Sequence, residues 1–121
     1  MANPSTGFGG AGTEVLRRGY IHAITNSEAT LLTGVANHIY TVLSIIFTEQ
    51  TGAGTHALHM YVDADLTGTD IYLMSSQPIT IEQTFVWNDK FVLTETDKLH
   101  ARLAGSGNID AWITYIDQQL A

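Results

Sequence analysis

Apolar and β-branched residues in this chain occur in short runs separated by Gly, Asn, Asp, Ser and Thr, with a new run about every ten residues. This spacing is typical of the strands and turns of an antiparallel sandwich or barrel. No segment combines helical periodicity with helix end signals, so we expect very little helix. The pattern predicts strands over residues 15–24, 29–32, 38–48, 55–62, 70–74, 79–87, 90–93, 98–104 and 109–117.

Strict alternation within several runs indicates strands that bury one face. Leu58, Met60 and Val62 alternate with other residues, and the run 98–104 has the same pattern. We therefore predict an all-β protein, a single antiparallel β-sandwich that is jelly-roll-like and has helix in under about a tenth of its residues. The predicted core consists of Leu43, Ile45, Phe47, Leu58, Met60, Val62, Phe85, Leu99, Leu103 and Ile113.

Two runs carry large apolar residues on both faces, whereas a sandwich strand usually has one solvated face. In the last run, Trp112 points away from the face that holds Ile113. We expect such outer faces to be covered by a loop or by another subunit. The alternative is an outer face that only satisfies strand propensity. In the run 38–48, one predicted face holds Ile39, Leu43, Ile45 and Phe47, and the other holds Tyr40, Val42 and Ile46.

Asn88 and Asp89 separate two apolar runs. Both residue types tolerate the left-handed backbone of a two-residue type I′ turn. They predict a hairpin that joins residues 79–87 to residues 90–93.

The first twelve residues contain four glycines, and Phe8 is their only aromatic side chain. Ordering such a segment costs about 1–2 kcal/mol of backbone entropy per residue, and the segment has little to bury in return. We therefore divide the chain into an extended Gly-rich arm, residues 1–13, and a β-sandwich domain, residues 14–121. The arm is expected to bind another chain through Phe8 or, as the alternative, to fold back on its own domain.

Composition narrows the classes of partner. The 121 residues suffice for one domain, and only 14% of them are charged, against about 25% in a typical protein. The formal net charge of −7 repels nucleic-acid phosphates and anionic membrane surfaces, so neither is an expected partner. The chain has no cysteine, which excludes a disulfide, a thiolate nucleophile and a cysteine-ligated zinc site.

The beginning of the sequence has no basic segment followed by an apolar stretch, as a secretory signal would have. The longest apolar run, residues 42–47, is far shorter than the roughly 20 residues of a membrane span. We expect a protein that is made in, and stays in, a cytoplasm-like compartment until something else exports it.

The sequence DADLTG at residues 63–68 matches the first half of a calcium-binding loop, with oxygen ligands at alternating positions before a glycine. The match fails at the twelfth position, where Met74 stands in place of the bidentate glutamate. Two interpretations remain, a looser calcium site formed by Asp63, Asp65 and Asp70 or a tight acidic turn between two strands.

No other group of residues has the spacing that catalysis or metal binding requires. His56 and His59 lie three apart, which places them on opposite faces of a strand. Ser106 lies between two glycines but lacks the strand–turn–helix setting of an activated nucleophile. We therefore expect no enzyme activity, no catalytic residue, no metal site and no cofactor. Exposed aromatic residues would bind sugars by stacking, although on strands they more often fill cores and interfaces; the candidates are Tyr40, Tyr61, Tyr72, Trp87 and Trp112.

Several segments resemble the small β-sandwich virion proteins of tailed bacteriophages. They are YTVLSII at 40–46, YVD at 61–63, FVWNDKFVL at 85–93, DKL at 97–99 and WITYID at 112–117. The resemblance covers most of the chain after Tyr20. It implies a decoration, neck or tail-associated component without enzyme activity, and it carries no catalytic residue over to this chain.

These observations together predict a capsid decoration or cement protein of the virion, which forms a homotrimer and binds the major capsid protein or other virion proteins. The alternatives are a neck, tail or baseplate adaptor and, from a different class, a carbohydrate-binding module on a fibre. Arg17 and Arg18 form a basic pair that is expected to point to opposite faces of its strand and to meet acidic partner surfaces. The predicted interface residues are Phe8, Arg17, Arg18, Tyr40, Val42, Ile46 and Trp112.

Deletion of residues 1–12 should leave the melting temperature of the sandwich unchanged but weaken binding to purified capsids, because the arm does not enter the core. The substitution Phe8→Ala alone should remove about 1.5–3 kcal/mol of that binding. Calorimetric melting and co-sedimentation with capsids, on the intact, arm-deleted and Phe8→Ala proteins, measure the two effects. Equal retention of the three proteins would contradict this role, and a collapsed melting temperature would show that the arm packs on its own domain.

Overall fold

The computed structural model describes residues 13–52 and 54–120, except for the side chain of Leu66. Residues 1–12 of the predicted arm, with Phe8, lie outside these residues, whereas Thr13, its last residue, begins the first strand. The elements of the described chain are β1 (Thr13–Ile24), β2 (Ala29–Thr33), β3 (His38–Glu49), β4 (His56–Asp63), the short 3-10 helix η1 (Ala64–Leu66), β5 (Asp70–Ile79), β6 (Thr84–Trp87), β7 (Phe91–Leu93), β8 (Lys98–Leu103) and β9 (Ile109–Gln119).

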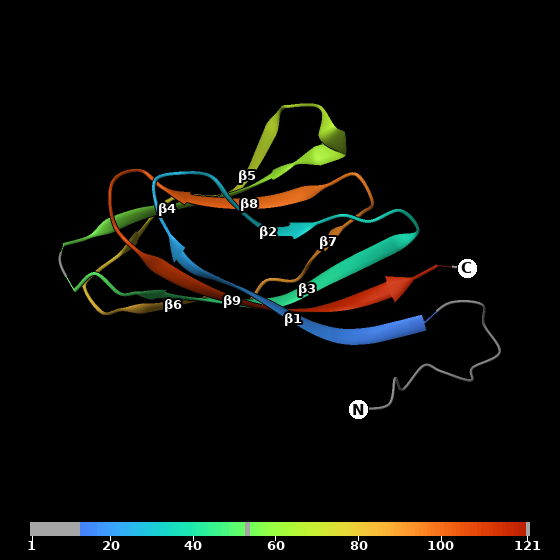
Figure 1. Cartoon of the computed structure of the whole chain (residues 1–121), viewed down its shortest axis with the longest axis horizontal. Helices are drawn as coiled ribbons and strands as arrows, with labels where there is room; N and C mark the ends of the chain where they lie inside the picture. The colour runs from blue at the N-terminus through green and yellow to red at the C-terminus, as the bar shows by residue number, and fades with distance from the viewer. Residues whose placement is uncertain (1–12, 53, 121) are drawn as a thin grey trace.

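The strands form two antiparallel sheets that pack face to face (Figure 1). The five-stranded sheet has the order β1-β9-β3-β6, with β7 also paired to β3, and the four-stranded sheet has the order β2-β8-β4-β5. Because β6 and β7 pair with successive parts of β3, they act as one interrupted strand. The two sheets then have the strand arrangement of a jelly roll. The predicted all-β antiparallel sandwich is confirmed.

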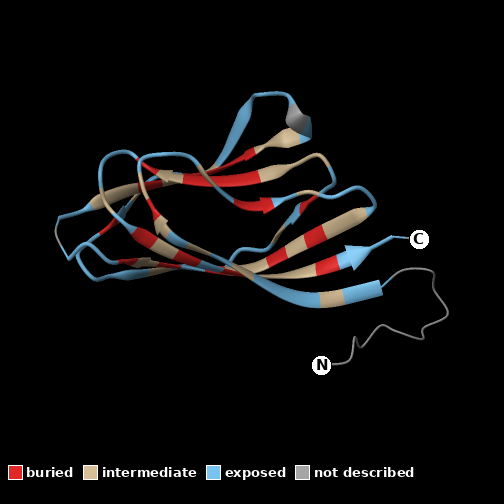
Figure 2. Cartoon of the chain, viewed as in Figure 1, coloured by how far each residue is buried: buried red, intermediate tan, exposed pale blue. Residues whose placement is uncertain are grey.

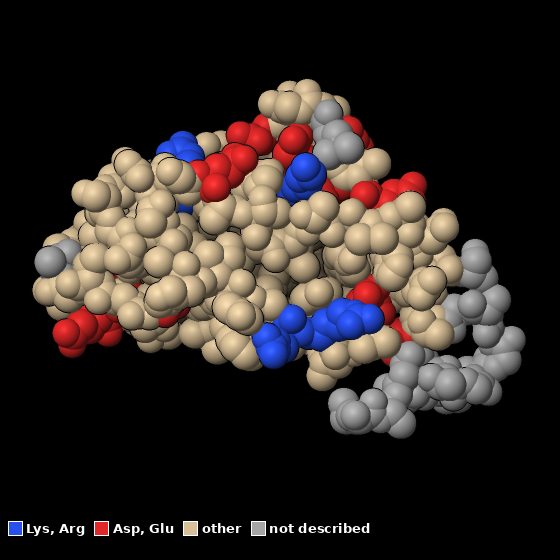
Figure 3. All heavy atoms as spheres, in the orientation of Figure 1, with Lys and Arg blue, Asp and Glu red and all other residues tan. Residues whose placement is uncertain are grey.

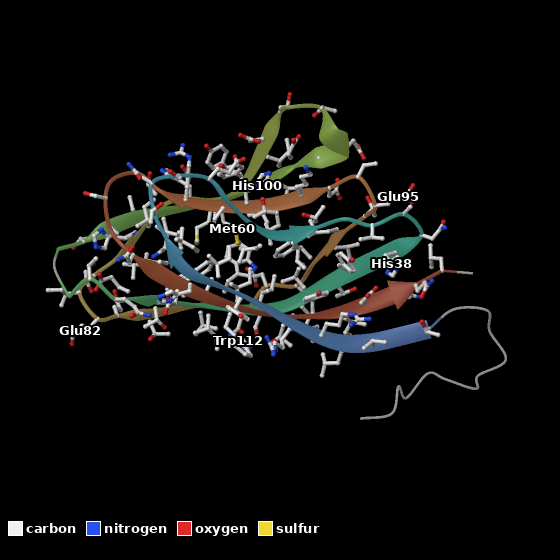
Figure 4. The ribbon with its side chains drawn as sticks, in the orientation of Figure 1. His38, Met60, Glu82, Glu95, His100 and Trp112 are labelled. Carbon is white, nitrogen blue, oxygen red and sulfur yellow. The ribbon has the colours of Figure 1, made fainter. Side chains whose placement is uncertain are left out.

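Side chains between the two sheets form the core, which Figure 2 shows as red segments in both layers. The predicted core residues are buried except Leu43 and Phe85, which are half-buried. Phe85 packs against the core, with its ring centroid 6.5 Å from that of Phe47. Met60, labelled in Figure 4, lies between the layers and is fully buried.

A bulge in β3 changes which face of this strand enters the core. The register of β3 against β9 shifts between Val42 and Ser44. Before the shift Tyr40 and Val42 are buried, whereas after it the buried residues are Ile45 and Phe47. A bulge inserts one residue, so it exchanges the two faces of the strand beyond it. The predicted continuous alternation is therefore wrong, and Tyr40 and Val42 belong to the core rather than to the outer side.

The segment 79–87, predicted as one strand, contains a turn. In this turn the N–H of Gln83 donates to the carbonyl of Thr80 at 3.1 Å, and the side-chain oxygen of Gln83 accepts the N–H of Thr80. The predicted hairpin at Asn88 and Asp89 is also wrong, because β6 and β7 do not pair with each other. They pair with β3 on either side of its bulge, so the link between them runs past the bulge.

Replacement of Ile45 or Phe47 by alanine should lower the free energy of unfolding by about 2–5 kcal/mol, since each leaves a cavity in the core. The matched control is Ile46→Ala in the same strand, which should cost under about 1 kcal/mol because Ile46 points to solvent. Urea denaturation of the three variants gives these values. Equal losses at Ile45 and Ile46 would mean that the strand faces are assigned incorrectly.

Candidate functional site: the outer face of the five-stranded sheet

We call the side of the five-stranded sheet that points away from the four-stranded sheet the outer face. A row of large apolar residues crosses it from strand to strand. Tyr20 of β1 lies opposite Trp112 of β9, which lies opposite Ile46 of β3, and Ile46 lies opposite Val86 of β6. Tyr20 is 63% exposed and Trp112 is 45% exposed, and Figure 4 shows Trp112 pointing away from the sandwich. A contiguous apolar row of this kind is typical of a surface that binds another protein.

A second apolar row runs parallel to the first. Leu16 of β1 lies opposite Ile116 of β9, Ile116 lies opposite Thr41 of β3, and Thr41 lies opposite Val92 of β7. Between the two rows lies a polar row, in which Arg18 of β1 is opposite Thr114 of β9. The outer face thus alternates apolar and polar rows, with one cation near its edge.

Arg18 leans over the first row. Its guanidinium carbon lies 5.1 Å from the centroid of the Trp112 ring and 5.6 Å from that of Tyr20. The two rings are stacked with centroids 6.0 Å apart. A guanidinium at this distance from aromatic rings gains cation–π attraction, so the three side chains hold one another in place. Large side chains that are ordered in this way lose little conformational entropy when a partner binds.

Beside the first row the outer face is hollowed. The hollow has a volume of about 330 Å³ and lies among Tyr20, His22, Ile46, Asp110 and Trp112, with Thr48 beside them. A bulge in β1 shapes it, because the backbone N–H of Ala23, whose φ is +66°, donates to Oδ1 of Asp110 at 2.8 Å. Its walls are mainly apolar, with a carboxylate on the rim.

Arg17 points to the other side of β1, toward the end of the core. Its Nε donates to Oδ2 of Asp117 at 2.8 Å, and Nδ1 of His38 lies 2.6 Å from Oδ1 of the same carboxylate. Burial, and then the charge of Asp117, raise the pKa of Tyr40. The carboxylate of Asp117 is buried but bound on both oxygens, so this cluster closes the end of the sandwich. Figure 4 shows His38 there, near the end of β9.

On the opposite surface of the molecule, formed by the four-stranded sheet, other side chains of the chain cover the ring of Tyr61. Tyr61 points outward but is buried, because Tyr72 and His100 pack against its ring at centroid distances of 5.0 and 5.6 Å. Its hydroxyl donates to Oε2 of Glu28 at 2.5 Å. Burial, followed by this hydrogen bond, raises the pKa of Tyr61. The Tyr61 ring is therefore not free to stack on a sugar.

The acidic segment after β4 is a structural turn. Oδ1 of Asp63 accepts the N–H of Gly68 at 3.0 Å, and Oδ1 of Asp65 accepts the hydroxyl of Thr96 at 2.8 Å. Among the residues that the structure describes, no three His, Asp or Glu side chains gather closely enough to bind a metal ion. The hydrogen bonds of Asp63 and Asp65 are those of the tight acidic turn, which is one of the two interpretations of this segment.

Glu49, at the end of β3, is a buried carboxylate with a structural role. Its oxygens accept the backbone N–H groups of Glu82 at 2.7 Å and Thr51 at 2.6 Å, and that of Gly52 at 3.2 Å. Nε2 of His56 lies 3.3 Å from Oε1. These contacts, led by the N–H of Glu82, lower the pKa of Glu49. The carboxylate therefore joins the turn after β3 to the turn before β6.

Three predicted interface residues come together in this structure. Arg18, Ile46 and Trp112 share the outer face, while Arg17 lies on the other side of β1, as its alternation with Arg18 predicts. Tyr40 and Val42 lie in the core, and Phe8 is outside the described residues. The predicted interface residues do not include the remaining members of the two rows, which are Leu16, Tyr20, Thr41, Val86, Val92 and Ile116. Alternation within residues 15–24 identifies Leu16 and Tyr20 as neighbours on one face, but not the strand that lies beside them.

Comparison with protein-family models and with curated proteins gives no match. Solved structures do match. The chain is similar to a protein described under "Bacillus endospore appendages form a novel family of disulfide-linked pili", with a TM-score of 0.55 and 17% identity over 100% of this chain and 96% of that chain. It is also similar to a protein of the T13 IBDV viral particle, with a TM-score of 0.52 and 10% identity over 88% of this chain and 31% of that chain.

These likenesses establish the fold, which this chain shares with a pilus protein and with part of a viral particle protein. The expected resemblance to virion proteins is confirmed for the fold only. The two structures do not show that the chain belongs to a family of tailed-bacteriophage decoration proteins. The whole chain aligns with nearly all of the pilus protein, whereas it corresponds to about a third of the viral chain. Within residues 13–52 and 54–120, no helix is long and apolar enough to cross a bilayer.

The substitution Glu49→Gln should destabilise the protein most at neutral pH. Because folding lowers the pKa of Glu49, the charged carboxylate stabilises the fold above the pKa it has in the unfolded chain, and this contribution is lost as the pH falls through the folded value. The difference in unfolding free energy between wild type and variant should therefore shrink below about pH 4. Denaturation curves at a series of pH values test this. A difference that is the same at pH 3 and pH 7 would mean that the charge of Glu49 is unimportant.

Proposed function

We propose that this protein is a non-enzymatic structural subunit of a homo-oligomeric protein shell, and that it assembles through the outer face of the five-stranded sheet. The observation that carries the proposal is the apolar row of Tyr20, Trp112, Ile46 and Val86, which crosses the sheet without a loop to cover it in the described residues. Burial of such a row against a partner is favourable by about 25 cal/mol per Å² of apolar surface.

The contrast between the two sheets supports this choice of surface. Tyr61 on the four-stranded sheet is covered by its own neighbours, and its hydroxyl is bound within the chain. Tyr20 and Trp112 are held in position by Arg18 but stay accessible. Aromatic residues and arginine are the side chains that most often dominate binding energy at protein interfaces.

The specific form of the proposal is a capsid decoration or cement protein, a homotrimer that binds the major capsid protein in the virion. The jelly-roll fold, which it shares with part of the T13 IBDV particle protein, supports this form, as does a surface with few charges. A weak contact that is repeated over a shell gains strength through avidity, so one modest face per subunit suffices. A neck, tail or baseplate adaptor would use the same face.

A second candidate is a subunit of a surface filament, which the alignment over the whole chain with the pilus protein favours. The pili in that comparison are disulfide-linked, whereas this chain has no cysteine. A filament of this protein would therefore depend on non-covalent contacts alone, and the outer face is the apolar surface that could supply them.

The alternative of a carbohydrate-binding module has less support. Sugar recognition by stacking needs exposed aromatic rings in a row. Of the candidates, Tyr40 and Tyr61 are buried and Trp87 is half-buried, whereas Trp112 and Tyr72 are exposed on opposite surfaces of the sandwich. Tyr20 is exposed beside Trp112, but Arg18 lies over both rings.

The test compares the full-length wild type with Ile46→Asp, which places a charge in the middle of the apolar row. Ile81→Asp is the matched control, because Ile81 is also exposed but lies in the turn between β5 and β6. Sedimentation velocity and negative-stain electron microscopy should show trimers or larger assemblies for the wild type and the control, and only monomers or dimers for Ile46→Asp. A closed trimer supports the decoration protein, and long filaments support the second candidate. Oligomers of Ile46→Asp that equal those of the wild type, or a wild type that is monomeric at every concentration, would refute the proposal.

A further inference from the structure

The free edge of β1 is the longest open sheet edge in the described part of the chain. β1 has 12 residues and ends the five-stranded sheet, where β9 pairs with one of its sides and no strand pairs with the other. Figure 2 shows most of this strand as exposed. Natural sheets usually protect such an edge with a proline, a bulge, a short strand or charged side chains, because unpaired backbone groups recruit another strand. The charges of β1, at Glu14, Arg17 and Arg18, are of both signs, so they do not repel every second strand. β1 has no proline, and its bulge against β9 lies between Ile21 and Ile24, so residues 13–20 remain regular.

We propose that β1 pairs antiparallel with β1 of a second copy of this chain around a two-fold axis at Leu16. Each Leu16 then lies opposite Leu16 of the second copy, and the two five-stranded sheets join into one continuous sheet. This contact adds to the proposed function, on which it rests only for the premise that the chain forms homo-oligomers. It uses the edge of the sheet rather than the outer face.

Charge complementarity selects this register. With the axis at Leu16, residue 14 lies opposite residue 18, so each Glu14 meets Arg18 of the other copy on the outer face. Residues directly opposed across antiparallel strands have Cβ atoms about 4.5–5.5 Å apart, and opposite charges there are stabilising. The two-fold axis creates this ion pair twice, on both sides of the apolar contact between the two Leu16 side chains. Figure 3 shows basic side chains gathered in the region of β1, the strand that carries Arg17 and Arg18.

Neighbouring registers are less favourable. An axis at Arg17 or at Arg18 places that arginine opposite the same arginine of the second copy, and like charges in directly opposed positions are destabilising. An axis at Val15 places Glu14 opposite Leu16, so the ion pair is lost. An axis between Val15 and Leu16 is excluded, because it would place Glu14 of the outer face opposite Arg17 of the core side, whereas opposed residues of antiparallel strands point to the same side of the sheet.

The inward-facing residues also fit the register at Leu16. Val15 lies opposite Arg17, whose head is held by Asp117 and whose aliphatic stem is then available to pack against the valine. Thr13 lies opposite Gly19, which has no side chain to collide with it. In this register even-numbered residues of one copy lie opposite even-numbered residues of the other. The outer faces of the two copies therefore lie on the same side of the joined sheet. The apolar rows of both copies therefore form one larger surface.

Cysteine cross-linking tests the axis directly, since the chain has no cysteine of its own. In the variant Leu16→Cys the introduced thiol lies opposite the same thiol of the second copy, so mild oxidation should give a disulfide-linked dimer. Val92→Cys is the matched control, because Leu16 and Val92 are both 54% exposed and lie on the outer face at opposite edges of the sheet. The control should stay monomeric on a reducing-agent-free gel. Equal cross-linking of the two variants would contradict the proposed axis.

Charge reversal tests the register. Arg18→Glu and Glu14→Arg should each weaken dimerisation about tenfold or more, measured by sedimentation equilibrium, because two attractive pairs become repulsive. The double variant with both substitutions should recover to within about threefold of the wild type, since the pairs are restored in reverse. A double variant as weak as either single variant would overturn the register, and circular dichroism confirms that all three variants are folded.

The edge contact and the outer-face contact can fail separately. Ile46→Asp should abolish larger assemblies but leave the dimer and its Leu16→Cys cross-link intact, because Ile46 lies on β3, two strands away from the free edge of β1. Loss of the cross-link in the Ile46→Asp background would contradict an independent edge contact. Assemblies that persist without any cross-link would instead leave the proposed function standing and refute the β1 dimer.

Discussion

Strand β9 determines both the core and the candidate binding face, because it pairs with β1 on one side and with β3 on the other. Opposed residues in antiparallel strands point to the same side of the sheet. Burial of Ile109 and Ile113 in the core therefore forces Trp112 outward, between Tyr20 and Ile46. A slip of one residue would bury Trp112 and expose Ile113. The same packing that fixes the register of the core thus also builds the apolar row on the surface.

The two sheets differ in how the aromatic side chains on their outer sides are covered. On the four-stranded sheet, Tyr72 and His100 cover Tyr61, and Glu28 accepts the hydrogen bond of its hydroxyl. On the five-stranded sheet, Arg18 orders the rings of Tyr20 and Trp112 but leaves them accessible. Tyr61 is therefore covered within the chain, whereas Tyr20 and Trp112 form a contiguous exposed aromatic pair.

Local alternation was sufficient to predict the sandwich, because a period of two survives in β4, β8 and β9. It failed in β3, where a bulge exchanges the faces and moves Tyr40 and Val42 into the core. It also failed at Asn88 and Asp89, since β6 and β7 pair with β3 rather than with each other. Bulges and pairing partners depend on contacts between residues far apart in the sequence, so alternation within one run does not contain them.

The account as a whole depends on the outer face becoming buried when the protein assembles. Hydroxyl-radical footprinting of the full chain, as dilute monomer and as assembled oligomer, measures this residue by residue. Trp112 and Tyr72 make a matched pair of reporters, since they are 45% and 44% exposed and lie on opposite surfaces of the sandwich. The account predicts that assembly protects Trp112 and Tyr20 from oxidation and leaves Tyr72 as reactive as before. Protection of Tyr72 with Trp112 unchanged would contradict it.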